Sequence, residues 1–192
     1  MAVKTFTTGE VLTASDTNTY LANSGLRYIT GGTQSGTTAL NVDNCFTSTY
    51  RNYRLVLTGI QSGSSSALRL NFRAGGSTNS DNSYRYAFRG LRDNGASGDT
   101  SSGGSLTFTE VGVYESVADT DLASVVIDIM SPAIATLTSA TCNAVGYESS
   151  VYQMRQGGFV HNSSNAFDGF RLSLSGTGNL TVVWQLYGYR IA

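Results

Sequence analysis

The chain has 192 residues, a length that suits one domain with a full hydrophobic core. Only 13% of the residues are charged, against roughly 25% in typical soluble domains, and the chain holds 22 glycines but one proline. The formal net charge of −1 excludes a general electrostatic attraction to nucleic acid or anionic membranes, and no apolar run reaches the roughly 18 residues of a membrane span.

The N-terminal part of the chain carries the clearest helix signal. Residues 1–12 suit an extended segment without the apolar run of a signal peptide. The stretch Thr13-Ala-Ser-Asp16 then forms a capping box, which predicts a helix over residues 14–24 that stops at Gly25. Because so short a helix is marginal alone, it must lie against its own domain, a second copy or another protein.

Beyond Gly31 and Gly32, which we interpret as a hinge, the chain alternates short strands and turns. Turn signals about 8–12 residues apart are typical of a β-sandwich or jelly roll. We therefore predict an all-β fold with a short N-terminal helix, divided into an attachment-type segment over 1–32 and a β-sandwich domain over 33–192. Strands are expected near residues 37–43, 52–60, 66–74, 83–91, 104–109, 111–116, 122–130, 133–138, 141–149, 156–161, 168–175 and 179–190.

One strand pattern occurs twice. Residues 50–59 and 167–176 both read aromatic, two spacers, aromatic, Arg, Leu, any residue, Leu, hydroxyl, Gly. In the first copy, Tyr53, Leu55 and Leu57 share one face of an extended strand. The two copies predict two equivalent corners of one folded-over sheet, with chance similarity as the alternative.

The residues that carry chemistry are few. His161 is the single histidine, and no Gly-x-Ser-x-Gly nucleophile elbow is present, which argues against a Ser-His-Asp triad. Cys45 and Cys142 are expected to be buried free thiols. Acidic turns such as Asp119-Thr-Asp121 are more often capping groups than calcium ligands. We predict a protein that is not an enzyme, with no catalytic, cofactor-binding or metal site.

Aromatic and basic residues suggest surfaces for contact. Tyr84, Tyr86 and Phe88 alternate with Arg85 and Arg89, and such tyrosine and arginine surfaces are enriched at protein interfaces. An ordinary solvated strand face is the alternative. The loop over residues 93–104 is expected to be exposed. Four further tyrosines are candidates for stacking on sugar rings or for packing in the core or between subunits, namely Tyr147, Tyr152, Tyr187 and Tyr189.

The run from Phe6 to Asn23 resembles the opening of tail-fibre and other virion appendage proteins of tailed bacteriophages. These openings share the core Phe-x-x-Gly-x-Val-Leu-Thr-Ala-x-Asp-x-Asn, matched here by Phe6, Gly9, Val11, Leu12, Thr13, Ala14, Asp16 and Asn18. The stretch 44–54 is similar to the first strand of their β domains, and 185–189 to the last strand. Residues 75–165 show no such resemblance.

The resemblance implies a virion protein assembled in the host cytoplasm. Its N-terminal segment would dock to other virion proteins, and its β domain would face outward, usually as a homotrimer. The docking residues would be Phe6, Val11, Leu12, Asp16, Asn18, Tyr20 and Leu21. The candidates for binding a host surface, for example a glycan, are Tyr84, Arg85, Arg89, Arg92, Asp93 and Asn94. Neither nucleic acid nor membrane insertion is expected.

Three functions remain open at this point. The first is a tail-fibre or adhesin-type protein that binds the host surface, and the second is a capsid decoration or head-fibre protein with a structural role. The third is a small polysaccharide-degrading enzyme, since paired carboxylates occur in any fold. The third is disfavoured, because no catalytic set stands out in a chain of this length. The first two share every feature visible in the sequence, and we take the first as the prediction.

Overall fold

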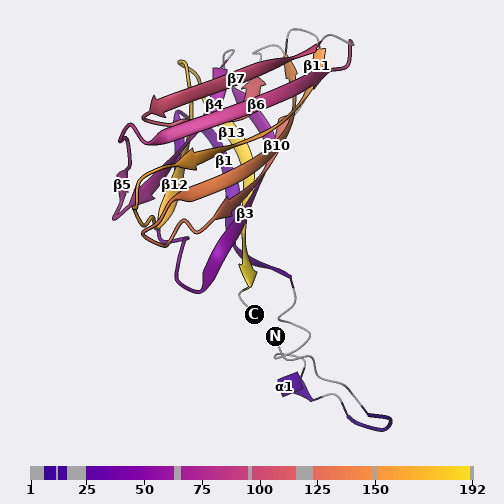
Figure 1. The fold of residues 1–192 in the computed structure, drawn as a ribbon. Helices are drawn as coiled ribbons and strands as arrows, with labels where there is room; N and C mark the ends of the chain where they lie inside the picture. Colours follow the sequence, from indigo (N-terminus) through magenta and orange to yellow (C-terminus); the bar gives the residue numbers. More distant parts are fainter. Residues whose placement is uncertain are drawn as a thin grey trace.

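A computed structural model describes residues 7–11, 13–16, 25–62, 66–94, 97–115, 123–148 and 151–190. This part of the chain is all-β and forms two antiparallel sheets (Figure 1). The larger sheet has the order β1 (Leu26–Thr37), β13 (Leu180–Arg190), β3 (Tyr50–Ser62), β9 (Ala123–Met130), β10 (Thr138–Glu148), β11 (Val151–His161), β6 (Tyr84–Arg92) and β7 (Ser97–Leu106). The smaller sheet has the order β2 (Ala39–Val42), β12 (Gly169–Leu174), β4 (Ser66–Ala74) and β5 (Ser77–Thr78), and β8 (Thr109–Glu115) also pairs with β4.

Strand alternation explains why the two sheets pack face to face. In β3, Tyr53, Leu55 and Leu57 are fully buried, whereas Arg54 and Val56 point to the other face. Strands β9 and β13 repeat this division, with Val125, Ile127 and Ile129 of β9 and Val182, Trp184 and Leu186 of β13 directed inward. The apolar inner faces of the two sheets enclose one hydrophobic core, which fits the expected β-sandwich. The jelly-roll topology stays a prediction.

Aromatic rings from both sheets meet at the centre of the core. The ring of Phe46 lies 4.8 Å from that of Tyr53 in the larger sheet and 6.1 Å from that of Phe170 in the smaller one, measured between centroids. Phe170 also contacts Trp184 of the larger sheet edge to face, at 5.8 Å. The Tyr53 hydroxyl donates a hydrogen bond to the carbonyl of Thr47, so this buried polar group has a partner.

The repeated pattern marks two points where the chain changes sheets. The first copy lies in β3 of the larger sheet and leads into β4 of the smaller sheet. The second copy lies in β12 of the smaller sheet and leads into β13 of the larger one. Both copies direct an aromatic residue and two leucines into the core. The copies therefore form two corners, as predicted, but in two sheets rather than in one folded-over sheet.

Of three local predictions, the structure leaves one untested and contradicts the other two, one of them only in part. Helix α1 covers Ala14–Asp16 only, and the rest of the expected helix lies outside the described residues, so that helix stays a prediction. The expected hinge is wrong, because Gly31 and Gly32 lie inside β1 and pair with Gln185 and Trp184. The loop expected over 93–104 is also wrong beyond residue 96, since Ser97–Leu106 is strand β7. No helix in the described ranges is both long and apolar enough to cross a bilayer.

Candidate functional site

The β domain has two distinct ends. Leu26, at the start of β1, pairs with Tyr189, near the end of β13, so both chain ends leave the sheet on the same side (Figure 1). We call this side the proximal end. Strand β6 runs away from it and finishes at Arg92, so the turn that holds Asp93 and Asn94 lies at the opposite, distal end. The N-terminal segment thus enters the domain at the end opposite this turn.

The structure divides the six residues considered for host binding. Tyr84 is wholly buried, and its hydroxyl accepts a hydrogen bond of 2.8 Å from the backbone N–H of Phe72, so its place on a surface is wrong. Arg85 and Arg89 are exposed on the outer face of the larger sheet, while Asp93 and Asn94 are exposed in the distal turn.

Arg92 has the same strand parity as Tyr84, so it points to the opposite face from Arg85 and Arg89, and it is half-buried. Seven residues of extended strand separate Arg85 from Arg92, a length of about 24 Å. The six residues therefore do not form one site. Arg92, Asp93 and Asn94 share the distal end, and Arg85 lies near the proximal end.

An apolar surface that the sequence did not predict lies between these two groups. Leu91, Val145 and Met154 are 61%, 45% and 59% exposed. They form one row across three neighbouring strands, because Val145 pairs with Met154 and Met154 pairs with Leu91. Tyr152 follows on the same face, with its ring 4.7 Å from that of Tyr147. We call Leu91, Val145, Tyr152 and Met154 the distal apolar patch.

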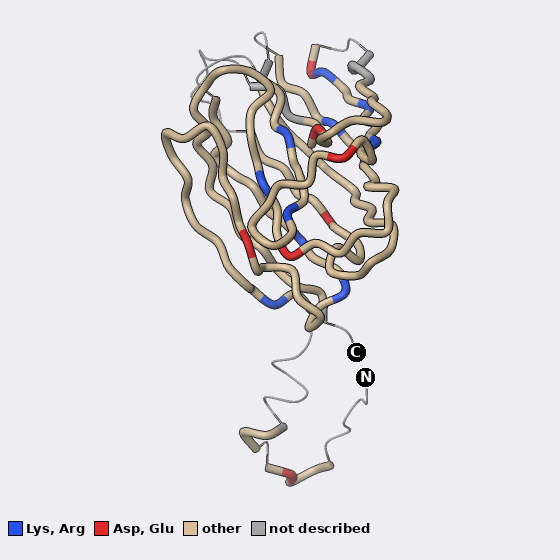
Figure 2. The backbone as a smooth tube through the Cα atoms, turned by 90° about the vertical axis from the view of Figure 1, so that its left-hand side faces the viewer, with Lys and Arg blue, Asp and Glu red and all other residues tan. Residues whose placement is uncertain are grey.

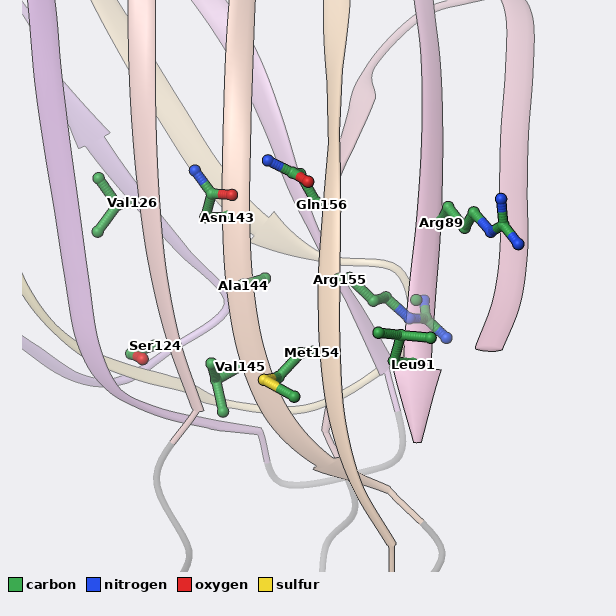
Figure 3. Close-up of a pocket in the computed structure, with 11 residues that line it drawn as sticks. Arg89, Leu91, Ser124, Val126, Asn143, Ala144, Val145, Met154, Arg155 and Gln156 are labelled. Carbon is green, nitrogen blue, oxygen red and sulfur yellow. The ribbon is translucent and has the colours of Figure 1, made fainter. Parts of the chain in front are cut away.

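A shallow cavity of about 670 Å³ adjoins this patch (Figure 3). Asn143 and Gln156 pair across β10 and β11 in the next row and supply its amide groups. Arg89 lines the cavity, but its guanidinium extends across β7 and away from the apolar side chains (Figure 3). Arg155 is almost wholly buried, and its Nε donates to Gln153. No carboxylate is among the described residues that line the cavity.

A polar network occupies the proximal part of the same outer face. The Nε and Nη2 atoms of Arg54 donate to the two oxygens of Asp128, at 2.8 and 2.7 Å, and the hydroxyl of Tyr189 also donates to this carboxylate. Burial disfavours the charged carboxylate, but these hydrogen bonds outweigh it and lower the pKa of Asp128. The charges of Arg54 and Asp128 are therefore neutralised by one another.

The tyrosines considered for sugar stacking lie in two pairs on this face. Tyr147 and Tyr152 lie at its distal side, as described above. Tyr187 lies farther toward the proximal end, where its ring contacts that of Tyr28 at 5.8 Å and its hydroxyl donates to Gln185. Tyr189 is held by Asp128. None of the four is fully buried, so the alternative that they pack in the core of the domain is wrong.

His161 belongs to the core rather than to an open site. Its Nε2 lies 2.8 Å from Asp81 and its Nδ1 lies 3.2 Å from the hydroxyl of Ser163, so the three residue types of a triad do meet. The imidazole is wholly buried, with its ring centroid 4.6 Å from Tyr84 and 4.9 Å from Phe167. A substrate has no access to this ring in the observed conformation, and we assign it the structural role of tying β11 to the turn around Asp81.

The remaining chemistry-bearing residues agree with a structural interpretation. Cys45 and Cys142 are both buried and unbonded, as expected, and burial raises the pKa of Cys45 to about 12. A thiol with so high a pKa is a poor nucleophile. In the described part of the chain, no group of three or more His, Cys, Asp or Glu side chains is placed to hold a metal ion.

The docking residues are only partly described. Val11 is 79% exposed, and Asp16 is the last residue of α1. Phe6, Leu12, Asn18, Tyr20 and Leu21 lie outside the described residues. Comparison with protein-family models, with curated proteins and with solved structures finds no match to this chain.

Proposed function

We propose that this chain is a bacteriophage virion protein of the tail-fibre or adhesin type. Its N-terminal segment docks to other virion proteins, and its β domain is presented to the host surface. The observation that carries the proposal is the polarity of the domain. The segment with the appendage-like sequence enters β1 at the proximal end, and the exposed Asp93 and Asn94 lie at the distal end.

Other features support this proposal. A low content of charged residues and an exposed apolar patch suit a chain that works in an assembly, for which we propose a homotrimer within the virion, put together in the host cytoplasm. The distal residues Arg92, Asp93 and Asn94 are the contacts that we propose for a host-surface glycan. The protein acts by binding and carries out no reaction. A jelly-roll topology and an N-terminal docking helix complete the proposed architecture.

Deleting residues 1–25 tests the attachment role. The deletion ends before β1 begins at Leu26, so the β domain is expected to keep its circular dichroism spectrum and melting temperature. We expect the truncated chain to be lost from purified particles, measured by immunoblotting particles grown with the variant as the only copy. Normal incorporation of the truncated chain would contradict the attachment role.

A pair of point variants makes the same test without shortening the chain. Val11 and Val183 are both exposed, the first in the N-terminal segment and the second on β13. Val11→Glu is expected to reduce incorporation, and Val183→Glu is expected to leave it unchanged. Electron cryomicroscopy of the particles then separates the tail-fibre function from a capsid decoration or head-fibre function. Density at the tail supports the former, and density over the capsid overturns it in favour of the latter.

A further inference from the structure

We propose that the distal apolar patch is the surface through which copies of this chain associate with one another. Three of its members, Leu91, Val145 and Met154, are aligned by strand register and project from the same face of the sheet. All three are near half exposed or more. Since the domain already has a complete core between its two sheets, these side chains contribute nothing to that core.

The charges around the patch identify the occupant. Two identical surfaces repel one another when each carries unpaired charge of one sign, and burial of such charge is costly. Here no carboxylate is among the described residues that line the adjoining cavity, and the guanidinium of Arg89 is directed over β7 (Figure 3). The nearest pair on the same face, Arg54 and Asp128, is internally neutralised. The patch is therefore compatible with a second copy of itself.

The composition of the patch disfavours a sugar as its occupant. Three of its four members are aliphatic or thioether side chains, which offer a sugar neither a flat aromatic face nor a hydrogen bond. Methionine, tyrosine and leucine suit a protein surface, because methionine adapts its shape and tyrosine supplies rigid contact area. The amides of Asn143 and Gln156, in the adjoining row, provide hydrogen bonds at the rim of such a contact.

The size of the patch limits the form of the assembly. The patch and the lining of the adjoining cavity together span the four strands β9, β10, β11 and β6 and three residue rows, which with side-chain margins cover about 400 Å² on each copy. Two copies would bury about 800 Å², which is below the roughly 1,000 Å² expected of a specific pair. A closed ring, in which each copy contacts two neighbours, buries more of this face than a pair does.

This inference deepens the proposed function and rests on it for the orientation of the copies. A virion appendage needs all its N-terminal segments at one end and all its distal turns at the other. The patch lies on the outer face of the larger sheet, beside the distal turn, so side-by-side contact of these faces allows the copies to point in one direction.

Sedimentation velocity of the purified full-length chain tests the proposal without any virus particle. We expect the unmodified chain to sediment as an oligomer that dissociates on dilution. Val145→Glu and Met154→Glu are each expected to raise the dissociation constant of self-association about tenfold or more, because each buries a carboxylate in an apolar contact. Val183→Glu is the matched control, since Val183 is 40% exposed on the outer face of the same sheet but outside the patch.

The possible results distinguish failure of the proposed contact surface from failure of the proposed function. A monomeric unmodified chain would overturn the inference and leave docking by residues 1–25 to be judged from particle incorporation. Oligomers unaffected by both patch variants, or weakened equally by Val183→Glu, would also overturn it. Binding of another purified virion protein to the patch of a monomer would assign the surface to that partner instead.

Chemical cross-linking provides a second measurement that does not depend on destabilising the contact. A short bis-maleimide linker is expected to join copies of the Met154→Cys variant and not copies of Val183→Cys. The two native thiols are buried and do not compete in the folded chain. Equal cross-linking of the two variants would contradict a contact centred on the patch.

Discussion

The outer faces of the two sheets are built in opposite ways. On the smaller sheet, the outward side chains of β4 are Arg69, Asn71 and Arg73, and the latter two are more than nine-tenths buried. The amide of Asn71 donates to the carbonyls of Asn79 and Thr107, so flanking segments of the same chain cover this face. The polar groups of Asn71 and Arg73 are thus buried outside the apolar core and are hydrogen-bonded within the chain.

The larger sheet shows the reverse arrangement. Its outer face leaves apolar side chains exposed at the distal apolar patch, and no described loop covers them. Figure 2 shows that most of the described backbone carries no charge, in keeping with the 13% of charged residues in the chain. The smaller sheet is thus covered by its own chain, whereas the larger sheet leaves an apolar surface exposed, which we propose that a second copy covers.

The largest effect is expected from breaking the polar face of the smaller sheet at Arg73. Its guanidinium donates to both oxygens of Asp43, to Asn41 and Thr78, and to the carbonyl of Gly76, so it ties β2, β4 and β5 together. Arg73→Ala leaves these acceptors and a carboxylate without their cation. We expect a loss of about 3 kcal/mol in the free energy of unfolding, measured with urea.

Arg171 provides the control for this variant. It lies on the same outer face, in register with Asn71, but is only half-buried. Arg171→Ala is expected to cost less than about 1 kcal/mol, as is usual for partly exposed charges. Equal losses at Arg73 and Arg171 would mean that the buried network has no special part in holding the smaller sheet.

A smaller effect is expected when acid protonates the carboxylates of the two faces. Hydrogen bonds from Arg73 lower the pKa of Asp43, and those from Arg54 and Tyr189 lower that of Asp128. A folded-state pKa below the unfolded value of about 3.9 stabilises the fold above that pH, and this contribution is lost as pH falls through the folded pKa. The melting temperature should therefore fall below about pH 4.

Amide variants assign this fall to the two faces. Asp43→Asn on the smaller sheet and Asp128→Asn on the larger sheet cannot ionise, so each should have a lower melting temperature at neutral pH and a shallower decline in acid. Differential scanning calorimetry between neutral and acidic pH measures both effects. A variant with the unmodified slope would show that its carboxylate does not contribute to acid unfolding.

Sequence reasoning predicted the strands with strong alternation and missed those without it. The pattern in β3 identified Tyr53, Leu55 and Leu57 as inward residues, and the strand expected near residues 122–130 is β9, in the middle of the larger sheet. Strand β7 reads Ser-Gly-Asp-Thr-Ser-Ser-Gly-Gly-Ser-Leu and contains no apolar alternation. It is held as a strand by pairing with β6, a tertiary effect that its own sequence does not encode.

The candidate site was harder to predict, because it depends on which face of the sheet each side chain occupies and on which residues pair between neighbouring strands. Tyr84 and Arg85 are adjacent in an extended strand, so they point to opposite faces and cannot share one surface. Which of the two faces outward depends on how β6 packs. The patch of Leu91, Val145 and Met154 joins three strands, and only their pairing register brings these residues into one row. In the sequence, the patch was indicated by Val145. This residue is apolar although it follows the inward-facing Ala144 in β10 and therefore points outward.

The smallest effect is expected at the distal apolar patch of the larger sheet. Its dependence on protein concentration tests whether the outer faces of the two sheets differ as described. Val145→Thr exchanges a methyl for a hydroxyl at an exposed position, so it should change the free energy of unfolding by less than about 0.5 kcal/mol when the chain is dilute. Val125→Thr makes the same exchange on the buried face of β9 and should cost about 1–3 kcal/mol at every concentration. Because association stabilises the folded chain by mass action, Val145→Thr should lower the melting temperature only at concentrations where copies assemble. If the cost of Val145→Thr did not change with concentration, the patch would be an ordinary exposed surface, and the larger sheet would be as complete by itself as the smaller one.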